Sequence, residues 1–239
     1  MVGVKSDLGN VRKLNEDYAD FYEDDKVKIY VVADGMGGHN AGEIASKIAA
    51  QTIINYIKSN IKNDIVEKTF KNAIEDANKE VHSLAYKKEE YTGMGTTIVA
   101  CLITTMGVHI GNVGDSSCFI VKDNRVYKLT KDHSLVQELL DTGSISKEQA
   151  INHPQKNVIT RAIGTGKEVE IDIYNLNKEE YDYILLCSDG LTNDVDLENE
   201  LLELLRDNDI QEVCDKLVNR AKNNGGRDNI TVMLLGKEV

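Results

Sequence analysis

Four short apolar segments follow one another between residues 96 and 129, in the sequence TTIVACLITTMGVHIGNVGDSSCFIVKDNRVYKL. Their composition is typical of strands, over residues 96–104, 108–113, 117–121 and 126–129. The links between them are only a few residues long. Because a parallel crossover needs about a dozen residues or more, consecutive strands here must be antiparallel neighbours. The sequence therefore predicts a meander in this stretch and excludes a Rossmann-type winding.

Helical periodicity flanks the meander on both sides. Apolar residues recur at helical spacing within residues 44–57, 65–84, 197–205 and 210–221. Strand-like runs over residues 181–187 and 230–235 accompany the second pair of helices. We therefore expect an α+β fold in which helix pairs cover antiparallel sheets. No proline-rich or serine-rich linker divides the chain, so we expect a single domain over residues 1–239.

The segment from about residue 132 to residue 164 differs from the rest of the chain. It is polar, it contains two weak helical patches, and it has no long apolar strand. Connections of this length are uncommon in compact domains and are usually functional. We predict a flap here that shapes substrate selection.

The overall composition limits the partners and the compartment. A net charge of −12 argues against nucleic acid as a partner, since phosphate backbones attract Lys and Arg. The first residues lack the apolar stretch of a signal peptide, and no run is long enough to span a bilayer. The four cysteines form no CxxC pair and mostly lie in apolar runs, which indicates buried, reduced thiols. We therefore expect a cytoplasmic protein without membrane partners.

Aspartates stand at the ends of several apolar runs. Asp34, Asp115 and Asp189 each end a strand-like run beside a glycine, and Asp228 precedes the last run. Carboxylates at strand ends, with glycine allowing close approach of the backbone, suit hard divalent cations. Each aspartate alone has another explanation, because Asp-Gly and Asp-Asn favour turns. Together they indicate metal-assisted hydrolysis of a phosphoryl group.

The loop DGMGGHNAGE at residues 34–43 lies between a strand and a helix, where a nucleotide-binding loop would lie. The pattern GxGxxG from Gly35 meets Asn40 at its last glycine, and a P-loop from Gly37 meets Glu43 where lysine is required. A bound cation accounts for this loop better, with Asp34 as its ligand and the Gly35 carbonyl within reach of metal or water.

Two covalent phosphatase mechanisms also fail. Cys214 and Arg220 have the spacing of a Cys-x5-Arg loop, but the residues between them contain no glycine and continue an amphipathic helix. Such a segment cannot curl its N–H groups around a phosphate. An aspartyl-phosphate mechanism needs a second aspartate two residues after Asp34, where Met36 stands.

Eight motifs, in order along the chain, resemble those of one family. They are SDLGNVRKLNED at 6–17, VADGMGGH at 32–39, GMGTT at 93–97, GNVGDS at 111–116, LTKDHS at 129–134, TRAIG at 160–164, SDGL at 188–191 and GRDNIT at 226–231. The set resembles the PP2C-type (PPM) metal-dependent Ser/Thr protein phosphatases, specifically their compact bacterial branch, over the whole chain. The resemblance implies an αββα sandwich, with two antiparallel sheets face to face and helix pairs outside. It also implies a binuclear Mn²⁺ or Mg²⁺ centre at one end of the sandwich.

The resemblance implies a role for each acidic residue that matches the family. Asp34 is expected to bridge both metals, and Gly35 to contribute its backbone carbonyl. Asp189 and Asp228 are expected to bind the second metal. Asp115 matches a carboxylate that helps to bind a third, weaker ion.

Other matching residues carry roles around the metals. Glu16 resembles a residue that holds metal-bound water, and Asp17 is expected to support it. Arg12 resembles the arginine that grips the substrate phosphate, with a surface salt bridge as the alternative. His39 is a candidate proton donor or a plain loop histidine, because some family members place a histidine directly after Asp-Gly, where this chain has Met36 and the histidine comes three residues later. Family members often carry arginine where this chain has Ser117, which alters the local charge balance.

The resemblance implies a phosphatase that removes phosphate from serine and threonine on proteins by attack of a metal-bridging hydroxide. We expect phosphorylated protein substrates, a bacterial Ser/Thr kinase whose action it opposes, and a monomer. Two alternatives stay open: a non-catalytic module on this fold that senses a phosphoprotein, and a metal hydrolase of small phosphoesters. Degenerate relatives usually lose ligands, and no expected ligand is missing from this sequence.

Overall fold

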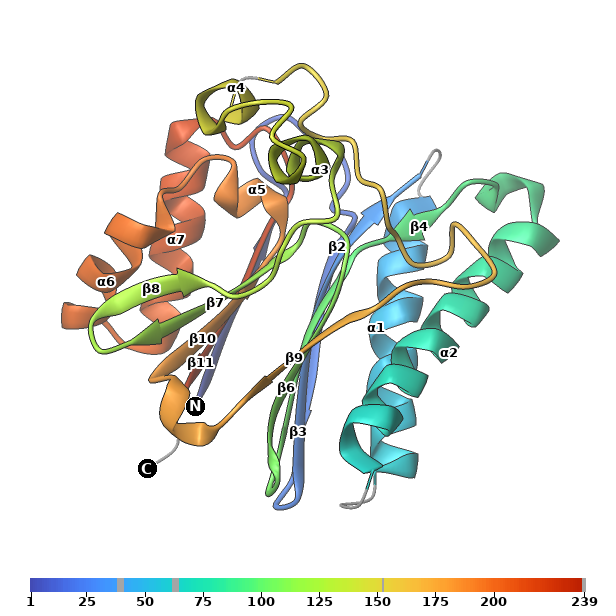
Figure 1. Cartoon of the computed structure of the whole chain (residues 1–239), viewed down its shortest axis with the longest axis horizontal. Coiled ribbons are helices and arrows are strands. Elements are labelled where there is room, and N and C mark those ends of the chain that lie inside the picture. The colour runs from blue at the N-terminus through green and yellow to red at the C-terminus, as the bar shows by residue number, and fades with distance from the viewer. Residues whose placement is uncertain (38–40, 62–64, 152, 238–239) are drawn as a thin grey trace.

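Two antiparallel sheets packed face to face form the centre of the molecule (Figure 1). The structure is a computed structural model and describes residues 1–37, 41–61, 65–151 and 153–237. The first sheet has the order β1 (Val2–Asp7), β11 (Ile230–Gly236), β10 (Tyr183–Cys187), β7 (Ser117–Lys122) and β8 (Arg125–Lys128). The second has the order β2 (Asp17–Glu23), β3 (Val27–Met36), β5 (Ile98–Thr104), β6 (Gly107–Val113) and β9 (Asp172–Leu176), with β4 (Gly95–Thr96) paired to the end of β3.

Helix pairs cover the outer faces of both sheets (Figure 1). On one side lie α1 (Ala41–Asn60) and α2 (Val66–Lys87), and on the other lie α6 (Leu197–Asp207) and α7 (Ile210–Asn224). The layers therefore run helix, sheet, sheet, helix, which confirms the predicted αββα sandwich. Within the described residues, no helix is long and apolar enough to cross a membrane.

Strand β3 shows how the layers fix the position of an aspartate. Successive side chains of a strand point to opposite faces. Ile29 and Val31 pack in the core beneath α1 and α2, whereas Tyr30 and Val32 pack between the two sheets. Asp34 continues the alternation of Tyr30 and Val32, so its side chain points into the end of the layer between the sheets.

The predicted meander is wrong in one respect. The pairs β5–β6 and β7–β8 are antiparallel neighbours as expected, but β6 and β7 belong to different sheets. Gly114, with φ of 106°, turns the chain between them, and β7 pairs with β10 instead of β6. Both strands are buried over most of their length, so no alternation of buried and exposed residues reveals this change of sheet. The crossing places Asp115 at the same end of the sandwich as Asp34.

The segment after β8 lies above this end of the sheets, at the top of Figure 1. Its two weak helical patches are α3 (Leu135–Asp141) and α4 (Lys147–Ile151). The short helix α5 (Asp189–Thr192) follows β10 directly below it. Segments from several distant parts of the sequence therefore meet at one end of the molecule.

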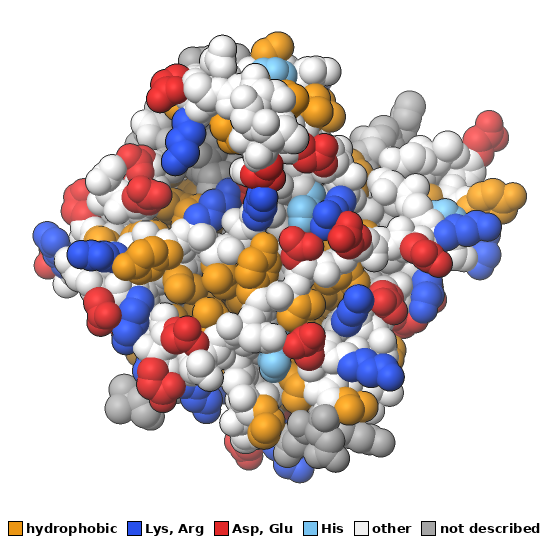
Figure 2. Space-filling model, viewed as in Figure 1, with side chains coloured by type: hydrophobic (Ala, Val, Ile, Leu, Met, Phe, Trp, Pro, Cys, Tyr) orange, Lys and Arg blue, Asp and Glu red, His pale blue; other side chains and the backbone are white. Residues whose placement is uncertain are grey.

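All four cysteines are free and buried, in agreement with the predicted reduced thiols. Cys214 lies in α7, where burial raises the pKa of its thiol to about 12. Arg220 of the same helix donates a hydrogen bond of 2.9 Å to Glu200. The helix therefore cannot form a phosphate loop from these two residues. Figure 2 shows acidic and basic side chains interspersed over one face, so the net negative charge forms no single patch there.

Candidate active site

A cavity of about 230 Å³ opens at the end of the sandwich below α3. Five of its described lining residues are acidic, and Arg12 is the one cationic side chain among them. The described lining consists of Arg12, Glu16, Asp34, Gly35, Met36, Gly37, Thr97, Asp115, Asn157, Ile159, Asp189 and Asp228. Asp34, Asp189 and Asp228, which lie far apart in the sequence, thus share one cavity.

The backbone of Asp34 is held by hydrogen bonds to Thr96 and Thr97 on the adjacent segment of the chain. Its N–H donates to Thr97 Oγ1 over 3.0 Å. Its carbonyl oxygen accepts from the Thr97 N–H at 2.9 Å and from the Thr96 hydroxyl at 2.9 Å. Burial, together with the nearby carboxylates of Asp17 and Asp189, raises the pKa of Asp34 well above its usual value. The strand end therefore holds a carboxylate that is costly to ionise without a cation.

Asp17 lies behind Asp34, outside the cavity wall. It stands opposite Asp34 in the register of β2 and β3 and is almost completely buried. Its Oδ2 accepts a hydrogen bond of 2.7 Å from the Ser188 hydroxyl, whereas its Oδ1 has no hydrogen-bond partner among the described residues. Burial raises the pKa of Asp17 to about 7. The structure thus places Asp17 where it can support the site from behind.

Asp189 begins α5, directly after β10. Its Oδ2 accepts from Asn193 over 3.0 Å, and its buried Oδ1 has no hydrogen-bond partner in the part of the chain that is described. Burial and the negative charge of Asp228 raise its pKa. A Cβ at Gly190 would lie 2.0 Å from the Asn229 carbonyl oxygen, so this position requires glycine. The close approach brings Asp189 and Asp228 together.

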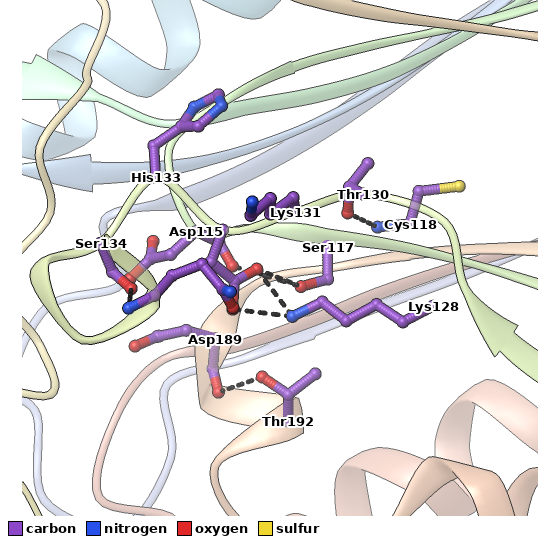
Figure 3. Close-up of polar contacts among 12 residues, drawn as sticks. Asp115, Ser117, Cys118, Lys128, Thr130, Lys131, His133, Ser134, Asp189 and Thr192 are labelled. Carbon is purple, nitrogen blue, oxygen red and sulfur yellow. Dashed lines mark hydrogen bonds and ion pairs between the residues drawn. The ribbon is translucent and has the colours of Figure 1, made fainter. Parts of the chain in front are cut away.

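Asp115 lies on the link between β6 and β7, and Figure 3 shows it beside Asp189. Burial raises its pKa to about 7, and the charges of Asp189 and Asp132 add to that effect. Lys128 of β8 contacts both oxygens of Asp132, at 2.6 and 2.7 Å. The Ser117 hydroxyl lies 3.4 Å from the same carboxylate. Lys128 therefore brings a positive charge close to Ser117, the position at which family members often carry arginine.

Glu16 connects the cavity to the start of α1. Its carboxylate accepts from the Gly42 N–H, and burial raises its pKa while Arg12 opposes that rise. A Cβ at Gly42 would lie 2.4 Å from Glu16 Oε1, and a Cβ at Gly35 would lie 2.1 Å from the Gly42 carbonyl oxygen. These two glycines allow β3, α1 and the Glu16 loop to pack against one another.

Arg12 forms an ion pair with Asp228, with 2.8 Å between Nη2 and Oδ2. About half of its side chain is exposed, and the hydrogen bond to Asp228 raises its pKa. The predicted phosphate-binding arginine thus lies at the mouth of the cavity, paired with a predicted metal ligand. His39, the predicted proton donor, lies outside the described residues.

Several residues of the site received no role from the sequence. Ser188 and Asn229 stand next to Asp189 and Asp228 in the motifs quoted above, and Thr97 ends the GMGTT motif. Asn229 illustrates their function, because its Oδ1 accepts from the Glu16 N–H at 2.9 Å. Asn157 and Ile159 come from the flap and reach the cavity wall. The presence of a threonine or asparagine in a motif does not show which backbone group it bonds, so these contacts required the fold.

The donor set fits hard divalent cations. Carboxylate oxygens and a backbone carbonyl are the ligands that Mg²⁺ and Mn²⁺ prefer. Asp17 and Asp189 each have a buried oxygen without a hydrogen-bond partner among the described residues, and burial raises the pKa of both carboxyl groups. An acidic cluster shows these features when no cation neutralises its charge. Among the described residues, no three His, Cys, Asp or Glu side chains are already arranged to hold an ion. The carboxylates nevertheless line one cavity.

Comparisons with known proteins indicate the family of this chain. A family profile described as protein phosphatase 2C matches residues 10–234. The serine/threonine phosphatase stp of Listeria monocytogenes serovar 1/2a is 40% identical over 240 residues, which cover 98% of this chain and 95% of that protein. The crystal structure of the serine/threonine phosphatase Stp1 from Staphylococcus aureus has a TM-score of 0.92 and 37% identity, covering 100% of this chain and 95% of that one.

A further structure similar to this chain is the catalytic domain of the serine threonine protein phosphatase PstP in complex with two manganese ions. Its TM-score is 0.82 at 30% identity, covering 98% of this chain and 96% of that chain. The profile match and the full-length relatives lead to one conclusion. This chain belongs to the protein phosphatase 2C family.

Proposed function

We propose that this protein is a metal-dependent protein serine/threonine phosphatase, which hydrolyses phosphoserine and phosphothreonine monoesters on proteins. One observation carries the proposal: Asp34, Asp189, Asp228 and Arg12 line a single cavity although they are far apart in the sequence. The relatives that match along the whole chain are named serine/threonine phosphatases. Phosphoproteins are therefore the proposed substrates, and a Ser/Thr kinase with opposite action is the proposed regulatory counterpart.

Two Mn²⁺ or Mg²⁺ ions are the proposed cofactors, as in the similar PstP structure with two manganese ions. Asp34, Asp189, Asp228 and the Gly35 carbonyl would hold them, and Asp115 would contribute to a third, weaker site. When bound, such ions supply Lewis acidity and an ionised water near neutral pH. Glu16 and Asp17 support this arrangement from the cavity wall and from behind it.

Arg12 is the proposed phosphate-binding residue. Its half-exposed side chain can leave Asp228 and present its planar fork of N–H donors to two phosphate oxygens. In that position it would orient the phosphoryl group and stabilise the negative charge on its oxygens in the transition state.

The described cavity wall offers no candidate for a protein nucleophile. The hydroxyl of Thr97, its one hydroxyl or thiol side chain, pairs with Ser116 over 2.7 Å and accepts from the Asp34 N–H. Water is therefore the proposed nucleophile. His39 is the proposed proton donor to the leaving serine or threonine oxygen.

The flap, about residues 132–164, is the proposed determinant of substrate selection. Asn157 and Ile159 of this segment form part of the cavity wall, at a place where a peptide that carries the phosphate would pass. We propose that the chain acts as a monomeric, single-domain enzyme of the cytoplasm.

A rate comparison tests the proposed function. The rates of a phosphothreonine peptide, p-nitrophenyl phosphate and ATP are measured with Mn²⁺, with Mg²⁺ and with excess EDTA. We expect metal-dependent hydrolysis of the peptide. Asp34→Asn and Asp228→Asn should lower it by more than about 100-fold, since even outer partners of metal ligands are worth about 10-fold to 100-fold. Asp215→Asn, at an exposed carboxylate on α7, serves as the matched control.

Three outcomes would contradict the proposal. Activity that survives EDTA would exclude metal dependence. Hydrolysis of ATP without hydrolysis of the peptide would indicate a phosphoesterase of small molecules. Absence of both activity and Mn²⁺ binding in calorimetry would indicate a non-catalytic module.

A further inference from the structure

His133 lies at a junction between the cavity and the flap. It follows β8 in the LTKDHS motif, and only 6% of its surface is exposed. In Figure 3 its ring points away from Asp115 and Asp189, so it does not face the reacting groups. A buried histidine that points away from the cavity can act by holding other residues in place.

One side of the ring holds the turn that carries Asp115. The Gly114 N–H donates to His133 Nδ1 over 3.0 Å, and the His133 N–H donates to the Gly114 carbonyl oxygen over 3.0 Å. The Asn112 side chain bonds the same carbonyl oxygen, at 3.3 Å. Asp115 is therefore attached to the rest of the site through a reciprocal pair of hydrogen bonds between its neighbour and His133.

The other side of the ring faces charged groups that belong to the flap and to β9. Because Nδ1 accepts a hydrogen bond, the neutral ring carries its proton on Nε2, which can donate to Asp172 Oδ2 at 3.2 Å. Arg161 Nη1 donates to Asp172 Oδ1 over 3.0 Å. Arg161 Nη1 also lies 3.2 Å from His133 Nε2 itself, so Arg161 at the end of the flap meets the ring both directly and through Asp172.

The flap segment that reaches the cavity is attached at the same place. The Thr160 N–H donates to the His133 carbonyl oxygen over 2.8 Å, and the Leu135 N–H donates to the Val158 carbonyl oxygen over 2.9 Å. Ser134 forms an isolated antiparallel bridge with Ile159, a cavity-lining residue. Residues 157–160 are therefore held by the segment that begins with His133.

On the basis of the proposed function, we propose that His133 is a positioning residue with two separable sides. Its Nδ1 side fixes the turn of Asp115 and so serves the chemical step. Its Nε2 side, through Asp172 and Arg161, orients the flap and so serves recognition of the peptide around the phosphate. The two sides should respond differently to substitution, because one holds the turn that carries Asp115 and the other contacts Asp172 and Arg161.

Two substitutions each remove one of the two hydrogen-bonding sides of the His133 ring and keep the other. In His133→Asn, the side-chain oxygen stands as many bonds from Cβ as Nδ1 does, so the acceptor for Gly114 is kept and the Nε2 contact is lost. In His133→Gln, the amide nitrogen stands as many bonds from Cβ as Nε2 does, so the donor to Asp172 is kept and the acceptor for Gly114 is lost. His82→Gln on α2 is the control for a histidine outside the junction.

Steady-state kinetics with two substrates give the first readout. We expect His133→Gln to lower kcat by about 10-fold or more for both the phosphothreonine peptide and p-nitrophenyl phosphate, as for partners of metal ligands. We expect His133→Asn to raise KM for the peptide by about 3-fold to 10-fold and to leave kcat for p-nitrophenyl phosphate close to wild type. Melting temperatures verify that both variants are folded.

Amide hydrogen exchange gives a second readout that needs no activity. His133→Gln should speed exchange in residues 112–117, and His133→Asn should speed it in residues 157–164. Equal losses on both substrates with the same exchange pattern in both variants, or lower melting temperatures without kinetic change, would overturn the proposal. A wild-type enzyme without metal-dependent activity would instead refute the proposed function, and exchange would still decide whether the two sides are separable.

Discussion

At the scale of single residues, Arg12 can pair either with Asp228 or with the phosphate of a substrate. In this structure it pairs with Asp228, and the charges of Glu16 and Asp34 also act on it. An ion pair that is about half exposed contributes little to stability, typically between about 0 and 1 kcal/mol. The position of Arg12 at the mouth of an acidic cavity is therefore better explained by anion binding than by stability.

Substitution of Arg12 tests this explanation. Arg12→Lys keeps the charge but loses the planar fork, and Arg12→Ala loses both. We expect kcat/KM for the phosphothreonine peptide to fall by about 10-fold in Arg12→Lys and by about 100-fold in Arg12→Ala. Melting temperatures should stay close to that of the wild type. Unchanged kcat/KM in both variants would show that Arg12 forms only a surface salt bridge.

At the scale of elements, the junction of β3 and α1 depends on glycine. A Cβ at Gly35 would lie 2.1 Å from the Gly42 carbonyl oxygen and 2.6 Å from that of Glu16, which no real contact permits. Any side chain there must push α1 away from β3. Because Asp34 precedes Gly35 and Glu16 contacts Gly42, the displacement would pass directly to two acidic residues of the cavity.

We therefore expect Gly35→Ala to destabilise the protein by about 2 kcal/mol or more and to abolish most of its activity. Gly107→Ala, in the β5–β6 hairpin, is the matched control, because its nearest neighbour would be 3.4 Å away at a φ of 147°. The control should lose about 1 kcal/mol and retain its activity. Denaturant unfolding and peptide hydrolysis measure the two effects. Equal behaviour of both variants would contradict a special role for the junction.

The sequence predicts the elements well where hydrophobic periodicity is strong, as in α2 and α7. It does not predict β9, because the residues DIYNL form a half-polar edge strand. The change of sheet between β6 and β7 is also hidden, because a three-residue link serves equally well for a hairpin or a crossing. The aspartates of the cavity could be named from their motifs, but the burial of Asp17 behind Asp34 depends on strand register.

At the scale of the whole molecule, acidic side chains from distant segments are concentrated at one end of the sandwich. Burial raises the pKa values of Asp17 and Asp115 to about 7, from a usual value of 3.8. A carboxyl group with a raised pKa in the folded state stabilises the fold below its unfolded pKa, and this contribution is lost as the pH rises through the folded pKa. The metal-free fold should therefore lose stability between about pH 4 and pH 7.

We expect the melting temperature of the protein in EDTA to fall from pH 5 to pH 8. Mn²⁺ should raise it more at pH 8 than at pH 5, because metal ligands must be ionised. Asp17→Asn removes one of the buried titrating groups and should flatten the pH dependence in EDTA. A melting temperature that rises with pH in EDTA, to the same extent in wild type and variant, would contradict this account.

The central claim is that segments distant in the sequence bring their carboxylates to one pair of divalent ions. Anomalous diffraction from crystals grown with Mn²⁺ tests it most directly. We predict two strong manganese peaks in the cavity, within coordination distance of Asp34, Asp189 and Asp228. A cavity without manganese at a saturating concentration, or peaks confined to other surfaces, would contradict the claim.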